Sequence, residues 1–145
     1  MTDDLTYVRE RIADYSAYDD ERARHDSDMR VRAYVGERLS AAQARLASGL
    51  DVATAKTLDD VLFRCMFSDQ VFVRKFEHAR LEGPMTAALV HSDRRLIEFA
   101  QRIPTLDAAA LRDLAVEIDK EFEYRRAPKP LVAAEATLPS TVPVD

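Results

Sequence analysis

The chain has 145 residues, a formal net charge of −5 at pH 7, and a charged fraction of 32% beside an apolar fraction of 47%. This is the length of one typical domain. The acidic balance argues against a nucleic-acid partner, because a phosphate backbone requires a positive patch. The single cysteine, Cys65, excludes an intramolecular disulfide. The sequence has neither a long apolar run nor an apolar leader after Met1, so we expect a cytoplasmic protein with no membrane contact.

Residues that break helices occur at few positions. The three glycines are Gly36, Gly49 and Gly83, and all six prolines follow residue 83. Elsewhere the chain is rich in Ala, Leu, Arg, Glu and Asp, the composition of long helices. The pattern predicts an all-α fold, an antiparallel bundle of four to five helices in one domain over residues 1–126. An extended, Pro-containing tail follows over residues 127–145.

The first two helices are predicted over residues 3–15 and 19–48, and the pattern leaves open whether they are one helix or two. In the first, apolar residues recur at helical spacing, at Leu5, Val8, Ile12 and Tyr15. In the second, the core-facing residues are Val31, Val35, Leu39, Ala42 and Leu46. Residues 19–30 are mostly charged and show no such stripe, which predicts a solvated extension or a partner surface.

Three more helices are predicted over residues 57–81, 84–103 and 106–126, after a loop over 50–56. Pro84 suits the first turn of its helix, and Pro104 ends that helix. The core-facing residues of the last two helices are Met85, Leu89, Ser92, Leu96, Phe99 and Ile103, and then Leu111, Leu114, Ile118 and Phe122.

The helix predicted over residues 57–81 is apolar all round. One face holds Leu58, Val61, Leu62, Cys65, Phe72 and Phe76, and the opposite face holds Phe63, Phe67 and Val71. A helix of this kind is buried on every side or is covered by another subunit. It is therefore the central helix of a monomeric bundle, an interface with a partner or a second copy, or the wall of a cofactor pocket.

Asp69 falls on the same face as Cys65, where a carboxylate is costly unless it is paired. We expect an arginine of another helix, such as Arg38 or Arg95, to pair with it. The alternative is a ligand or an acid with a raised pKa, although no second carboxylate or nucleophile lies at a telling spacing.

Glu21, His25 and Asp28 follow one another at i, i+4 and i+7, so they share a helical face and are compatible with a metal ion. Acidic residues are frequent in this chain, and the face also carries arginines. We therefore expect a solvated face of salt bridges, with metal binding as the alternative.

These observations favour a non-enzymatic, intracellular interaction or assembly protein. It would act through the apolar surface at Phe63, Phe67 and Val71, with the tail as a second contact surface. The expected partner is another protein or a second copy, by default in a two-fold dimer, and no cofactor is expected. One alternative is a bundle that binds a small ligand or a metal, with or without catalysis. The other is a regulatory domain that contacts nucleic acid through Arg94 and Arg95.

Overall fold

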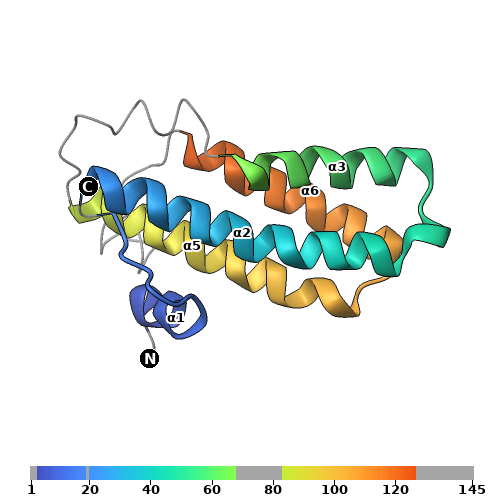
Figure 1. Ribbon diagram of the computed structural model, residues 1–145. Helices are drawn as coiled ribbons and strands as arrows, with labels where there is room; N and C mark the ends of the chain where they lie inside the picture. The colour runs from blue at the N-terminus through green and yellow to red at the C-terminus, as the bar shows by residue number, and fades with distance from the viewer. Residues whose placement is uncertain (1–2, 19, 68–82, 127–145) are drawn as a thin grey trace, which may run out of the picture.

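The computed structural model describes residues 3–18, 20–67 and 83–126. Within these ranges the chain is helical and contains no strand (Figure 1), which confirms the all-α class. The α-helices are α1 (Asp4–Arg11), α2 (Glu21–Arg45), α3 (Val52–Met66), α5 (Gly83–Arg102) and α6 (Ala108–Arg125). Two short 3-10 helices, Ala47–Gly49 and Ile103–Thr105, precede α3 and α6.

Among the described residues, α2, α3, α5 and α6 form the bundle, in which α2 and α6 each pack against both α3 and α5. Short connections make two antiparallel hairpins, α2 with α3 and α5 with α6. Figure 1 shows that α2 and α5 run in the same direction, and so do α3 and α6. Helix α1 lies outside the bundle and packs against α5.

An aspartate caps the start of four helices. The carboxylates of Asp3, Asp20, Asp51 and Asp107 each accept a hydrogen bond from the backbone N–H three residues later, at 2.7–2.9 Å. The cap at Asp51 corrects the predicted loop over 50–56. Because Asp51 satisfies the free N–H of Thr54, α3 begins at Val52 and not at residue 57.

Two predicted helix ends are wrong. Helix α1 ends at Arg11, because Ile12 is extended, and Asp14 and Ala17 then adopt positive φ angles of 60° and 56°. The first 48 residues therefore form two separate helices. Helix α3 ends at Met66, because Phe67 has an extended backbone (φ −133°, ψ 139°), so the helix predicted over 57–81 is not continuous. The rest of that range, 68–82, and the predicted tail, 127–145, lie outside the described residues.

The core includes most of the residues predicted from the apolar spacing, together with others that were not predicted, such as Ile97 and Ala100; the side chain of Met85 is not among those that the structure describes. Its members include Val31, Val35, Leu39, Ala42, Leu89, Leu96, Ile103, Leu111, Leu114, Ile118 and Phe122, while Leu46 and Phe99 are partly buried. The prediction that residues 19–30 carry no buried stripe is wrong, because Ala23, Ser27 and Asp28 are buried. The buried face of α2 therefore extends toward its N-terminus, where Ser27 and Asp28 are polar. None of the helices in the described ranges combines the length and the hydropathy needed to cross a bilayer.

Candidate functional site

The outer face of α3 and Phe67, the residue directly after this helix, expose three large apolar side chains. Phe63, Met66 and Phe67 are 63%, 64% and 54% exposed, and the two phenyl rings lie 5.1 Å apart between centroids. The inner face of α3 carries Leu58, Val61 and Cys65, all buried in the core. The structure therefore places the predicted interface residues Phe63 and Phe67 on the surface. Val71, the third of them, lies outside the described residues.

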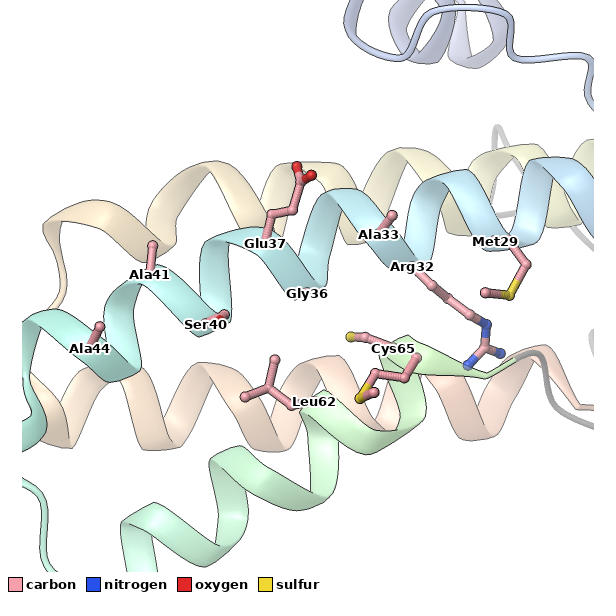
Figure 2. Close-up of a pocket in the computed structure, with 11 residues that line it drawn as sticks. Met29, Arg32, Ala33, Gly36, Glu37, Ser40, Ala41, Ala44, Leu62 and Cys65 are labelled. Carbon is pink, nitrogen blue, oxygen red and sulfur yellow. The ribbon is translucent and has the colours of Figure 1, made fainter.

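A groove runs beside this face, between α2 and α3, with a volume of about 880 Å³ (Figure 2). Its α2 wall is built mostly of small residues, Ala33, Gly36, Ser40, Ala41 and Ala44, and its α3 wall consists of Leu62, Cys65 and Met66. Met29, Arg32 and Glu37 complete the lining. We call this hollow the α2–α3 groove.

The two helices approach closely at Gly36 and Cys65. A Cβ atom on Gly36 would lie 3.1 Å from the Cβ of Cys65, tighter than an ordinary van der Waals contact. Glycine inside a helix costs about 1 kcal/mol relative to alanine. The close approach of α3 explains why a glycine stands at this position of α2.

Arg32 lies at one end of the groove and is 2% exposed. Its Nε donates to Asp28 at 2.8 Å and its Nη1 donates to the backbone carbonyl of Arg64. The ring of Phe122 covers the guanidinium, with 4.6 Å between Cζ and the ring centroid. The buried Nη2 has no hydrogen-bond partner in the described part of the chain.

A second concentration of polar groups lies inside the bundle. We call Tyr15, Tyr18, Asp28, Asp93 and Arg125 the central polar cluster. Asp93 accepts hydrogen bonds from Tyr15 at 2.5 Å, from Tyr18 at 2.7 Å and from Arg125 at 2.5 Å. Arg125 also donates to Asp28 at 2.7 Å and to the Tyr18 hydroxyl at 2.9 Å. The cluster thus joins α2, α5 and α6 to the segment before α2.

Burial sets the protonation of this cluster. It raises the pKa of the Tyr15 and Tyr18 hydroxyls, so both remain donors. Burial also raises the pKa of Asp93, against the opposing effect of Arg125 and the two tyrosine hydroxyls. Burial acts to lower the pKa of Arg125, yet the charge of Asp93 raises it well above its usual value, so Arg125 is a permanent cation.

A shorter chain of contacts extends the cluster toward the surface between α5 and α6. Arg125 donates to Ser92 at 3.2 Å, and Ser92 donates to Glu121 at 2.7 Å. Arg95 then donates to the other carboxylate oxygen of Glu121 at 2.8 Å. Arg95, one of the two partners expected for Asp69, is therefore paired with Glu121. Asp69 itself lies outside the described residues.

Of the candidate metal ligands Glu21, His25 and Asp28, the last two lie in different surroundings, and the side chain of Glu21 is not among those that the structure describes. Glu21 is the first residue of α2, His25 is exposed, and Asp28 is fully buried in ion pairs with Arg32 and Arg125. The expectation of a solvated face is wrong for Asp28. Across residues 3–18, 20–67 and 83–126, no three His, Cys, Asp or Glu residues are grouped so that they could hold a metal ion.

The arginines considered for nucleic-acid contact are engaged with carboxylates. Arg94 pairs with Glu98 and with Asp4, both at 3.3 Å, and Asp4 also lies 3.0 Å from His91. Together with the pair between Arg95 and Glu121, these contacts offset the positive charge of this part of α5.

Sequence reasoning expected the arginines near the candidate metal ligands, Arg32 among them, to form salt bridges, but it found neither the central polar cluster as a group nor the burial of Arg32. The spacing held a signal for Arg125, because it continues the stripe of Ile118 and Phe122 by one further turn. Asp28 likewise lies one turn before Val31 and Val35 on the buried side of α2. Comparison of the chain with models of protein families, with curated proteins and with solved structures found no match.

Proposed function

We propose that this protein is a non-enzymatic assembly protein that pairs with a second copy of itself through the outer face of α3. The observation that supports the proposal is the exposure of Phe63, Met66 and Phe67, each by more than half. Phe63 and Met66 lie on the last two turns of α3 and Phe67 directly follows its end, so the three are exposed together, whereas a monomer usually exposes its large apolar residues singly.

The chemistry of this surface suits an interface. Aromatic residues and methionine are enriched in the cores of protein interfaces, which a polar rim surrounds. Here the rim includes the exposed ion pair of Lys56 with Asp60, at 3.1 Å, and Arg64, which pairs with Asp119 at 2.9 Å. A two-fold axis beside α3 would place the same apolar patch of both copies in contact, the usual arrangement of a homodimer.

Sedimentation equilibrium over a concentration series tests this proposal. We expect the wild-type protein to sediment as a dimer and the double variant Phe63→Ser/Phe67→Ser to sediment as a folded monomer. Val52→Ser is the matched control, because Val52 is 87% exposed at the opposite end of α3. A wild-type monomer at every accessible concentration overturns the proposal, and so does a double variant that remains dimeric.

A further inference from the structure

The α2–α3 groove has the dimensions of a small-molecule site. Its volume of about 880 Å³ lies within the usual range for ligand pockets, roughly 300–1,000 Å³. From Met29 to Ala44 it follows about four turns of α2, or about 22 Å. Small side chains on α2 keep it open, and Leu62 and Met66 on α3 make the facing wall apolar.

The guanidinium of Arg32 gives one end of this groove a distinct chemistry. The side chain is 98% buried, and its Nη2 donor is unused within the described residues. A buried donor without an acceptor is costly, so an acceptor brought to it is strongly favoured. Asp28 supplies less than a full counter-charge to Arg32, because its other oxygen accepts from Arg125.

Glu37, the other charged residue among the described lining residues, does not oppose an anion at this end. Figure 2 shows the carboxylate of Glu37 directed away from α3, and its side chain is 79% exposed. The same view shows Met29 beside the Arg32 guanidinium. Nη2 is itself buried, so a ligand could reach it only after a side chain beside it moved, and Met29 has the flexible, unbranched side chain that such a movement requires.

We propose that the α2–α3 groove binds a small amphipathic molecule that carries one carboxylate at the end of an apolar chain. The carboxylate accepts a hydrogen bond from Nη2 of Arg32 at the buried end of an open, mostly apolar groove, where a charge-assisted bond is stronger than in bulk water. The apolar chain lies along Ala33, Gly36 and Ala44 and against Leu62 and Met66. This site adjoins the proposed dimer contact, because Met66 belongs to both surfaces, whereas Phe63 and Phe67 do not line the groove.

Isothermal titration calorimetry with three probes of equal chain length tests the ligand class. The probes are decanoate, decan-1-ol and decyltrimethylammonium, each kept below its aggregation concentration. We expect decanoate to bind one to one and about tenfold or more tighter than the alcohol, because a bond to a charged group exceeds a neutral one. Equal affinity for decanoate and the alcohol, tighter binding of the ammonium probe, or no binding of decanoate overturns the proposal.

Variants place the ligand in the groove. Ser40→Leu/Ala44→Leu fills the groove from two exposed positions of α2 and should weaken decanoate binding at least about tenfold by occlusion. Ala109→Leu, an exposed change on α6, is the matched control and should bind as the wild type does. Unchanged binding to the filled variant overturns the proposal.

Two further variants separate this site from other effects. Arg32→Met, if folded by circular dichroism, should bind decanoate and the alcohol equally, and a retained preference for decanoate overturns the role of Arg32. The Phe63→Ser/Phe67→Ser variant should still bind decanoate. A failure of the dimer proposal therefore leaves this test intact.

Discussion

Arg125 on α6 and Asp93 on α5 form an ion pair with 2.5 Å between Nη1 and Oδ1, and their side chains are 1% and 0% exposed. The second oxygen of Asp93 accepts from Tyr15 and Tyr18, and the second terminal nitrogen of Arg125 donates to Asp28. One pair of residues thus connects both hairpins of the bundle to the N-terminal segment. Each buried charge has an opposite charge within hydrogen-bond distance, which is the condition for keeping both in the core.

Replacing Asp93 by asparagine keeps the size of the side chain and removes its charge. Arg125 then retains Asp28 as a counter-ion, but the negative charge of its buried partner at position 93 is lost. We expect Asp93→Asn to lower the free energy of unfolding by about 3–5 kcal/mol in urea denaturation. Asp60→Asn breaks the exposed pair with Lys56 and should cost about 0–1 kcal/mol. Equal losses for the two variants would contradict the structural role of Asp93.

The two tyrosines attach the segment before α2 to the bundle. Tyr15→Phe and Tyr18→Phe keep the rings and delete the hydroxyls that donate to Asp93. Each should cost about 1–3 kcal/mol, because the acceptor is a buried carboxylate. In both variants, the backbone amides of α1 should exchange hydrogen faster than they do in the wild-type protein, because the segment that follows α1 is held less firmly. Tyr34→Phe is the control, because the Tyr34 ring stacks on the Arg38 guanidinium at 3.5 Å; an equal effect there would remove the special role of Tyr15 and Tyr18.

The apolar part of the fold could be predicted from the sequence, and the buried charges could not. Spacing identifies Val31, Val35 and Leu39 as core residues, because one helix face suffices to define them. Spacing places Asp28 and Arg125 in line with buried stripes, but a charged residue at such a position is taken to be solvated until its partner is known. That partner lies on another helix, so only the three-dimensional arrangement reveals the pair.

The candidate site divides in the same way. A helical wheel drawn over the predicted range 57–81 separates Phe63 and Phe67 from the core face, and the structure leaves both exposed. The α2–α3 groove depends on the distance between two helices, which no single helix pattern contains. Gly36, in the middle of an otherwise good helix, was the one local sign of close approach.

Cys65 should be an unreactive thiol in the folded protein. Burial raises its pKa from 9.0 to about 12, which lowers the thiolate fraction at pH 8 about a thousandfold. We expect the absorbance change with an aromatic disulfide reagent to be slow in buffer and fast in denaturant. Rapid labelling of the native protein would contradict the burial of this thiol.

Protonation of the aspartates that cap the helices should lower the stability of the protein in acid. The backbone hydrogen bond from Thr54 holds the pKa of Asp51 below its usual value of 3.8 in the folded state. The folded protein therefore binds fewer protons than the unfolded chain in this range, so the contribution of Asp51 is present above pH 3.8 and is lost as pH falls through the folded pKa. Asp51→Asn keeps a capping side chain and should show a shallower loss of stability between pH 5 and pH 2, measured by thermal denaturation. An unchanged pH profile would show that Asp51 does not contribute to the loss of stability at low pH.

Gly36 allows α2 and α3 to pack closely, and a bulky residue at this position should lower the stability of the protein by forcing the two helices apart. Alanine adds about 1 kcal/mol of helix propensity, yet its Cβ would meet the Cβ of Cys65 at 3.1 Å, so Gly36→Ala should be nearly neutral. Gly36→Leu adds atoms that cannot avoid α3 and should destabilise the protein by about 1–3 kcal/mol more than alanine in urea denaturation.

The control for this pair of variants is Gly49, whose added Cβ would meet nothing within 4 Å. Gly49→Ala and Gly49→Leu should therefore have similar stabilities, and the difference between leucine and alanine should appear only at position 36. Because Gly36 also lines the α2–α3 groove, Gly36→Leu should weaken decanoate binding as well. If Gly36→Leu is as stable as Gly36→Ala, α3 does not approach α2 as closely as the contact with Cys65 requires, and the groove would have a different shape.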